Sequence, residues 1–205
     1  MRESCVDTVI KVGGALIEDP ASFACLVDAL QALSTRHRDG PLLLVVPGGG
    51  PFADTVREVD WQLAAGDDAA HWMAILGMDQ HAHLLVARTP VAVLVESADE
   101  ARVAHEAHRL PVLAPYRWLR ARDPLPHSWS VTSDSIAAWI AIELGASELL
   151  LVKATTGPAD AVTDPYFHTV LETGAKAGRL VRVKVTGPRA LVARAWGTAE
   201  GNQGL

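Results

Sequence analysis

Short apolar runs alternate along this 205-residue chain with longer segments whose apolar residues recur at helical spacing. Residues 42–46 are apolar throughout, which is typical of a strand covered on both faces of a sheet. After Asp19-Pro20, an N-cap followed by a first-turn proline, residues 23–33 show one apolar helical face. Strands that alternate with helices favour parallel pairing. The sequence therefore predicts an α/β fold, a three-layer αβα sandwich with a mostly parallel central sheet.

The rest of the chain continues the same alternation. We expect strands over residues 6–12, 42–46, 91–95, 111–114, 149–152 and 180–185. We expect helices over residues 20–33, 52–63, 67–88, 98–108, 133–144 and 188–196, with loops over 120–129 and 155–167. No linker or internal repeat divides the sequence. A single domain over residues 1–198 with a flexible tail over 199–205 is predicted.

Composition excludes several functional classes. The 18 Lys and Arg residues against 24 Asp and Glu give a formal charge of −6, so binding of nucleic acid by a basic surface is not expected. Cys5 and Cys25 make no disulfide framework, and no set of Cys and His has metal-binding spacing, so we expect no protein-bound metal. The N-terminus lacks a signal-peptide core, and no apolar run approaches about 18 residues. We therefore expect a cytoplasmic protein that does not enter a membrane.

Two glycine clusters come directly after predicted strands. Gly13-Gly14 follows the first strand, and Gly48-Gly49-Gly50 follows the second. In a parallel sheet both clusters lie at the carboxyl edge, where glycine lets backbone N–H groups approach an anion. The alternative is that they form tight turns only. The clusters predict a site for phosphate groups.

Lys11 is one of only four lysines, and it lies inside an apolar strand two residues before the glycine turn. A buried ammonium is costly unless it meets an anion, so Lys11 is a candidate for binding phosphate. The alternative is an edge-strand lysine whose ammonium reaches water.

Residues 48–53 also match a degenerate dinucleotide fingerprint, G-x-G-x-x-A. That fingerprint normally follows the first strand and requires an acidic residue at the end of the next one, whereas here the spacing leads to Asp67-Asp68 at a helix start. A dinucleotide-dependent oxidoreductase is thus an alternative that only this fingerprint supports.

Three segments, residues 9–14, 46–50 and 132–138, together resemble the amino acid kinase superfamily, which includes uridylate, acetylglutamate and carbamate kinases and aspartokinase. The resemblance extends in the right order from residue 9 to about 198. Residues 47–57, 70–74 and 77–80 look like a narrower branch, the small kinases of methanofuran biosynthesis, which phosphorylate an aminomethylfuran-methyl phosphate to its diphosphate.

The resemblance implies a role for each matching position. Lys11 would bridge the transferring phosphoryl group, and Asp134 would orient the lysines. Gly13 and Gly14 would donate hydrogen bonds to the nucleotide phosphates. The remaining implied nucleotide contacts come from the loop over 155–167, namely Thr155, Thr156, Asp164, Tyr166 and Phe167. The family's Gly-Gly-Met segment with a second catalytic lysine is missing, which leaves Lys153 and Lys176 as candidates.

The resemblance also implies an acceptor site at Gly48, Gly49 and Gly50, to which we add Asp54, Arg57, Trp129 and Thr132. Arg57 could form a bidentate contact with an acceptor phosphate, or it could be part of a solvated helix face. Trp129 could flank an aromatic acceptor, or it could be a packing residue.

The implied activity is transfer of the γ-phosphoryl group of ATP, with Mg²⁺, to a small phosphorylated acceptor. An aminomethylfuran phosphate is the first expectation, and UMP or an amino acid is the alternative. A phosphate acceptor is already ionised, so no general base is needed and the problem is repulsion between anions. A non-catalytic nucleotide or oxyanion binding protein of the same fold stays open, because the second-lysine segment is missing. We also expect a homo-oligomer.

Overall fold

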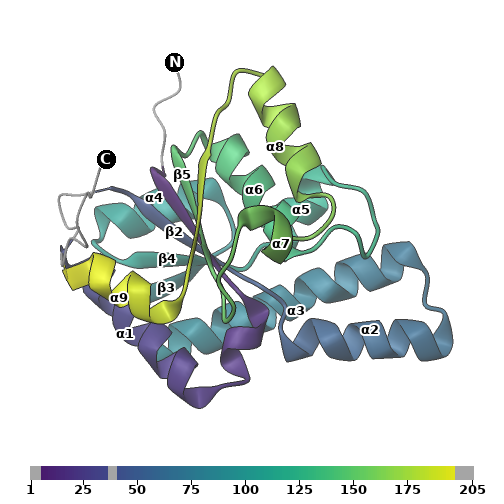
Figure 1. Ribbon diagram of the computed structural model, residues 1–205, viewed down its shortest axis with the longest axis horizontal. Helices are drawn as coiled ribbons and strands as arrows, with labels where there is room; N and C mark the ends of the chain where they lie inside the picture. The colour runs from purple at the N-terminus through teal and green to yellow at the C-terminus, as the bar shows by residue number, and fades with distance from the viewer. Residues whose placement is uncertain (1–5, 37–40, 197–205) are drawn as a thin grey trace.

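A parallel sheet forms the centre of the molecule (Figure 1). The computed structural model describes residues 6–36 and 41–196, and within them the sheet has six strands in the order β3-β4-β2-β1-β5-β6, every neighbouring pair parallel. The strands are β1 (Thr8–Val12), β2 (Leu43–Pro47), β3 (Ala92–Val95), β4 (Leu110–Leu113), β5 (Glu148–Val152) and β6 (Arg182–Thr186). The predicted fold class is confirmed, and all carboxyl ends meet at one edge.

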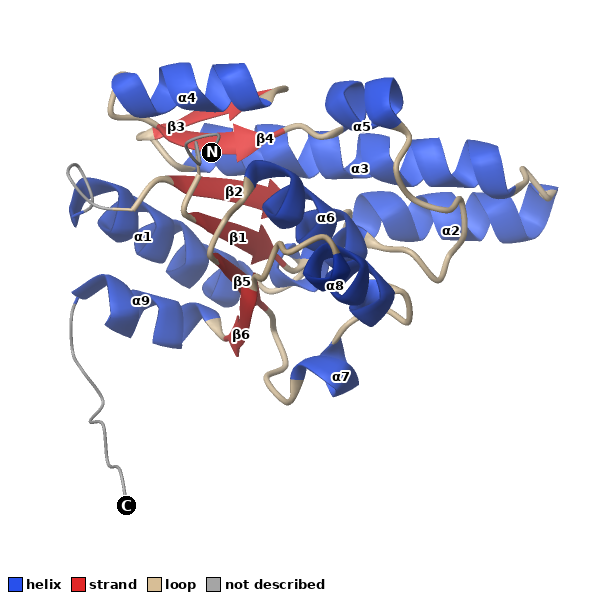
Figure 2. Cartoon of the chain, turned by 90° about the horizontal axis from the view of Figure 1, so that it is seen from above, coloured by secondary structure: helices blue, strands red, loops and turns tan. Residues whose placement is uncertain are grey.

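Helices cover both faces of this sheet, as Figure 2 shows from above. One face packs on α1 (Pro20–Arg36), on α9 (Pro188–Trp196) and on the second half of α3 (Asp67–Arg88). The other face packs on α4 (Ala98–Glu106), α5 (Tyr116–Arg122), α6 (Ser133–Leu144) and α8 (Phe167–Lys176). The short helices η1 (Gly14–Ile17) and α7 (Ala159–Val162) lie in the connections after β1 and β5. The two buried clusters make the three layers.

The alternation of side chains along the strands decides which face each lysine reaches. On β1, Val9 belongs to the cluster around α6, whereas Ile10 and Val12 belong to the cluster around α1. Because successive side chains point to opposite faces, Lys11 shares the α6 face with Val9. The same period carries Lys153, just beyond β5, to the α6 face. The pattern of the strands thus aims both lysines at one helix.

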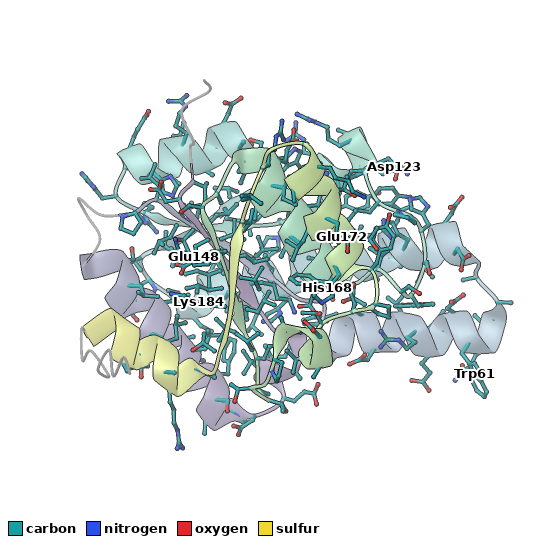
Figure 3. All side chains as sticks on the ribbon, turned by 45° about the horizontal axis from the view of Figure 1, so that its top comes forward. Trp61, Asp123, Glu148, His168, Glu172 and Lys184 are labelled. Carbon is teal, nitrogen blue, oxygen red and sulfur yellow. The ribbon has the colours of Figure 1, made fainter. Side chains whose placement is uncertain are left out.

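A helical hairpin extends beyond the sheet edge (Figures 1 and 2). It consists of α2 (Pro51–Leu63) and α3. The two helices approach closely at Gly77, where a Cβ would lie only 3.1 Å from the backbone nitrogen of Ala53. On the outer side of α2, Trp61 is 85% exposed and points away from the body of the protein (Figure 3). The hairpin supplies one wall of the site described below.

Three elements differ from the sequence-based expectations. Helix α5 was not predicted, and its last residues occupy the start of the predicted loop over 120–129. The predicted loop over 155–167 contains α7. Helix α8 was missed, although Phe167, Val170 and Gly174 recur at helical spacing and are buried. These helices are short, so few turns carry a periodic signal. Cys5 and the tail over 199–205 lie outside the described residues.

None of the helices in the described ranges is long and apolar enough to cross a membrane.

Candidate active site

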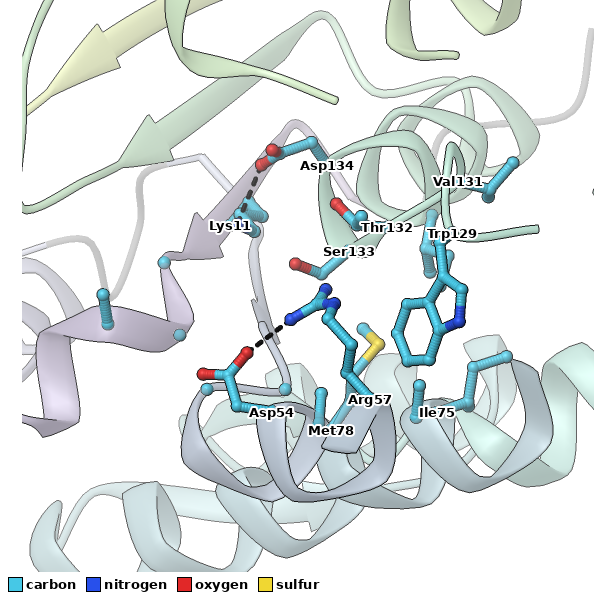
Figure 4. A pocket seen from close by; sticks show the side chains of 18 of the residues that line it. Lys11, Asp54, Arg57, Ile75, Met78, Trp129, Val131, Thr132, Ser133 and Asp134 are labelled. Carbon is cyan, nitrogen blue, oxygen red and sulfur yellow. Dashed lines mark hydrogen bonds and ion pairs between the residues drawn. The ribbon is translucent and has the colours of Figure 1, made fainter. Parts of the chain in front are cut away.

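A cavity of about 540 Å³ opens at the carboxyl edge of the sheet (Figure 4). Its walls come from the ends of β1 and β5, the two glycine loops, the α2–α3 hairpin and the first turn of α6. Most of the predicted site residues line it: Lys11, Gly13, Gly14, Gly49, Gly50, Asp54, Arg57, Trp129, Thr132, Asp134, Lys153 and Thr155. Residues from position 11 to position 162 thus surround one space.

A buried carboxylate between two ammonium groups forms one wall of the cavity. Lys11 Nζ lies 2.8 Å from Asp134 Oδ1, and Lys153 Nζ lies 2.7 Å from Asp134 Oδ2. The Lys153 ammonium also donates a hydrogen bond of 2.7 Å to the Val162 carbonyl. The side chains of Lys11 and Asp134 are only 3% and 6% exposed. We call these three residues the transfer centre. Its two cations and one anion leave a net positive charge beside the cavity.

Burial and charge act against each other in the transfer centre. Desolvation lowers the pKa of Lys11 below its ordinary value, while the Asp134 carboxylate opposes that shift. Burial alone would raise the pKa of Asp134, but the Lys11 and Lys153 ammonium groups outweigh it and hold that pKa below the ordinary range. Asp134 is thus a carboxylate at neutral pH, bound through both oxygens, and is not placed to accept a substrate proton.

The two glycine loops touch each other backbone to backbone. A Cβ on Gly14 would lie 2.2 Å from the nitrogen of Gly50, and Gly50 has a φ of +55°. Both positions therefore need glycine. Two of the N–H groups are already used, since Gly13 donates to Val152 O and Gly48 donates to Val12 O, each at 2.7 Å. Gly14, Gly49 and Gly50 remain as the lining glycines whose N–H groups could meet an anion.

His81, on α3, holds the second glycine loop in place through a hydrogen bond. Its ring is fully buried on α3, and Nδ1–H donates to the carbonyl of Gly48 at 2.7 Å. Burial lowers the pKa of His81, although the Gly48 carbonyl opposes that shift. The neutral ring therefore acts as a fixed hydrogen-bond donor. The sequence did not predict this contact, which joins residues 33 positions apart.

The end of the cavity on the α2–α3 side is more exposed. Arg57 Nη1 lies 2.5 Å from Asp54 Oδ1, and its guanidinium lies over the Trp129 ring, 4.6 Å from the centroid (Figure 4). Trp129 is held in turn by Asp60, whose Oδ2 accepts its indole N–H at 2.8 Å. The side chains of Arg57 and Asp54 are 52% and 59% exposed. We call Asp54, Arg57 and Trp129 the acceptor end.

One face of α3 completes this end of the cavity and was not predicted. Its lining residues recur every three or four positions and are Asp67, Ala70, His71, Ala74, Ile75 and Met78. Burial, together with the neighbouring His127, lowers the pKa of His71 to about 4, so this ring is neutral at pH 7. Helical spacing alone could have shown that these residues share a face, but it could not show that the face meets a cavity. Ser133, before Asp134, was missed as well.

Five predicted site residues do not line the cavity. Gly48 is turned toward β1, and Thr156 is exposed. Phe167 is fully buried, and Tyr166 packs against the cluster around α6. Asp164 is 9% exposed and binds the start of α6. The motif at 164–167 thus serves packing and helix capping in this structure.

No site made of protein ligands alone suits Mg²⁺ in the described part of the chain, where no group of three His, Cys, Asp or Glu side chains could hold a metal. Both oxygens of Asp134 already face ammonium groups. Mg²⁺ commonly binds through one or two carboxylates together with substrate phosphates and water. The residues present therefore offer no resident metal centre.

Comparison with known proteins identifies the family. Residues 8–162 match the amino acid kinase family. The chain belongs to the amino acid kinase family. This family comprises ATP-dependent phosphotransferases, and the match runs from the start of β1 to the end of α7 and so includes the whole transfer centre. The structure does not supply the context that the dinucleotide fingerprint over residues 48–53 requires. The fingerprint follows β2 rather than β1, and Asp67-Asp68 begin α3 instead of ending a strand.

The relatives of this chain fall in two groups. By sequence, it is 27% identical to the [5-(aminomethyl)furan-3-yl]methyl phosphate kinase of Methanocaldococcus jannaschii over 153 residues, which cover 74% of this chain and 68% of that protein. By structure, it is similar to the uridylate kinase of Archaeoglobus fulgidus, with a TM-score of 0.67, 16% identity and coverage of 93% and 96%. It is also similar to the carbamate kinase of Giardia lamblia bound to AMP-PNP, with a TM-score of 0.55 and 9% identity over 94% of this chain and 95% of that one. The structural similarities show the fold.

Proposed function

We propose that this protein is an ATP-dependent kinase that transfers the γ-phosphoryl group to a small phosphorylated acceptor. The observation that carries the proposal is the transfer centre, in which Lys11 and Lys153 are both fixed by Asp134 at the wall of the cavity. Transfer between two phosphates brings anions together, and preorganised cations are what such a reaction requires.

The cavity offers two sides for two substrates. The nucleotide would lie beside Gly13, Gly14 and Thr155, where η1 and the connection after β5 border the cavity. The acceptor would lie on the side of Gly49 and Gly50, against α2 and α3. Lys11, from the strand between these sides, would contact the phosphoryl group in transit. Lys153 is the second lysine of this proposal, because exposed Lys176 ends α8 and does not line the cavity.

The chemical step needs no base from the protein. An oxygen of the acceptor phosphate attacks the γ-phosphorus, and the bond from that phosphorus to the bridging oxygen of ADP breaks. A phosphate monoester has a second pKa of about 6, so the attacking oxygen carries no proton at neutral pH. Lys11 and Lys153 would neutralise the equatorial oxygens, and the N–H of Gly14 would add a hydrogen bond. Mg²⁺ would arrive with ATP, bound to its phosphates.

The acceptor end suits a small ring compound with charges of both signs. Arg57 could grip an acceptor phosphate bidentately, and Trp129 offers an aromatic edge. Asp54 and Asp67 are lining carboxylates that could face an ammonium group. The relative from M. jannaschii is named for an aminomethylfuran-methyl phosphate, which combines these groups. We therefore propose that phosphate as the acceptor, with UMP as the second candidate because of the fold shared with uridylate kinase.

An acceptor screen monitored by release of ADP tests the proposal. Purified protein is incubated with ATP and Mg²⁺ and with the furan phosphate, UMP, aspartate or acetylglutamate. Turnover is expected with the furan phosphate, and its product should be a diphosphate by ³¹P NMR. Turnover with UMP alone would overturn the furan phosphate as the proposed acceptor, but it would still support a kinase.

The competing function is binding without catalysis. Tight binding of ATP together with no ADP release for every phosphorylated acceptor would overturn the kinase proposal and favour a nucleotide-binding protein. A homo-oligomer also stays a prediction, which light scattering after size-exclusion chromatography checks.

A further inference from the structure

The connection between β5 and α8 reaches across to the start of α6 through one side chain. Asp164 Oδ2 accepts hydrogen bonds from the backbone N–H of Thr132 and Ser135, both at 3.0 Å, and from the Thr132 hydroxyl at 2.8 Å. Its Oδ1 accepts from the Ser135 hydroxyl at 2.5 Å and from the Tyr166 N–H at 3.1 Å. A carboxylate that is 9% exposed is thus satisfied almost entirely by one helix terminus.

This contact replaces the cap that α6 does not make for itself. Thr132 occupies the N-cap position, but its side chain makes no capping hydrogen bond. The first N–H groups of a helix need outside acceptors, and a negative charge is favourable there. Asp164 provides both from 29 to 32 residues away in the sequence. Capping by a distant residue links two segments that local capping would leave independent.

Asp134 lies between the two residues that Asp164 binds. Its neighbours Thr132 and Ser135 are fixed by Asp164, while its own carboxylate faces Lys11 and Lys153. The same connection makes a second contact, because the Val162 carbonyl accepts from Lys153 Nζ at 2.7 Å. Ala161 and Val162 also line the cavity. One connection therefore touches the transfer centre from two directions.

We propose that Asp164 is a positioning residue, which sets Asp134 against the two lysines and couples the cavity wall at Ala161 and Val162 to the transfer centre. This inference rests on the proposed kinase function, and it gives Asp164 a role other than the nucleotide contact that the family resemblance implies. Asp164 acts through α6 and touches neither substrate.

The test compares Asp164→Asn with wild type and with Glu148→Gln. Asparagine keeps the size of the side chain but removes the charge that the N–H and hydroxyl groups of α6 meet. We expect kcat to fall about 10-fold, while KM for ATP and for the acceptor changes less than about 2-fold. Glu148 is also a buried carboxylate, but it lies at the start of β5, away from Lys153 at the other end of this strand, and its carboxylate is 3.2 Å from Lys184 (Figure 3). Its variant should lower the melting temperature and leave kcat unchanged.

A double-mutant cycle separates positioning from general destabilisation. Ser135 is fully buried and does not line the cavity, so Ser135→Ala removes one partner of Asp164 without touching substrate. If both residues act on Asp134 through the same contact, the loss of kcat in the double variant will be clearly smaller than the product of the single losses. Independent, multiplying losses would overturn the coupling.

Hydrogen exchange distinguishes failure of this inference from failure of the proposed function. Asp164→Asn should increase amide exchange at Thr132 and Ser135, whether or not any acceptor is phosphorylated. If wild type shows no turnover, the kinase proposal fails and exchange alone decides the positioning role. Unchanged exchange at these amides, or a raised KM for ATP at normal kcat, would overturn the positioning role while leaving the kinase proposal intact.

Discussion

The two ends of the cavity use charge in opposite ways. The transfer centre buries its charges, with Lys11 3% and Asp134 6% exposed, and each ammonium is paired with the same carboxylate. At the acceptor end, Arg57 and Asp54 form an ion pair with more than half of each side chain in water. Removing one partner of a buried ion pair is strongly destabilising, whereas an exposed pair contributes about 0–1 kcal/mol.

This difference indicates that the transfer centre serves the chemical step and that the acceptor end serves substrate recognition. A chemical step that depends on a few cations needs them fixed before the substrate arrives, and burial against a helix and a sheet fixes them. Recognition of a particular acceptor tolerates side chains that move, such as an arginine that can exchange Asp54 for a substrate phosphate. We therefore expect changes at the transfer centre to affect kcat and changes at the acceptor end to affect KM.

The largest effect is expected for Lys11→Ala. Loss of the buried cation should reduce kcat by about 10²–10³-fold, because a preorganised charge at the developing oxyanions is removed. Steady-state release of ADP with the furan phosphate measures it. Lys176→Ala, at an exposed position near the end of α8, is the matched control and should keep wild-type kcat. Equal losses in both variants would mean that the contrast between buried and exposed cations is false.

The next effect concerns pH. Asp134 favours the charged form of Lys11 against desolvation, so Asp134→Asn should lower the pKa of Lys11 further. As pH rises, the ammonium is then lost earlier, and the alkaline decline of kcat should move to lower pH than in wild type. Profiles of kcat against pH measure the shift, with Arg57→Ala as control. An alkaline decline that stays in place would exclude Lys11 as the titrating group.

A smaller effect is expected for Arg57→Ala. Because Arg57 is half-exposed and paired on the protein surface, its removal should spare stability and kcat. KM for the acceptor should rise about 10-fold, the value of one charge-assisted contact, with little change in KM for ATP. Initial rates with each substrate varied in turn measure this. A rise in KM for ATP alone would place Arg57 on the nucleotide side.

The smallest effect is expected for Asp60→Asn. Asp60 holds the Trp129 indole and also accepts the Gly66 N–H at 3.2 Å, so the variant weakens the support of Trp129 without altering the cavity lining. KM for the acceptor should rise about 2- to 3-fold. Glu58→Gln, on the same helix, is the control, because Glu58 accepts a hydrogen bond from Gln62 and Asp60 is the residue that accepts the Trp129 indole N–H. A larger effect on kcat than on KM would contradict this prediction, because Asp60 would then affect the chemical step and not only acceptor binding.

Prediction from sequence succeeded where the signal is local. The apolar runs predicted the strands, and Lys11 was predicted to face an anion from the end of the first strand, where it lies at the cavity. The glycine pairs after β1 and β2 were also correctly placed at the cavity. Asp164 and Phe167, which were expected to contact the nucleotide, do not line the cavity, because a family motif does not show whether a residue faces a ligand or the core.

The sequence by itself determined the layers, the sheet edge that carries the site, and the scarcity of lysines that makes Lys11 and Lys153 the available ammonium groups. Only the tertiary structure decided that both lysines share Asp134, that His81 supports Gly48, and that Asp164 caps α6. The physical reason is that alternation and helical periodicity are properties of neighbouring residues, whereas hydrogen bonds and ion pairs between distant segments depend on how the layers are packed together.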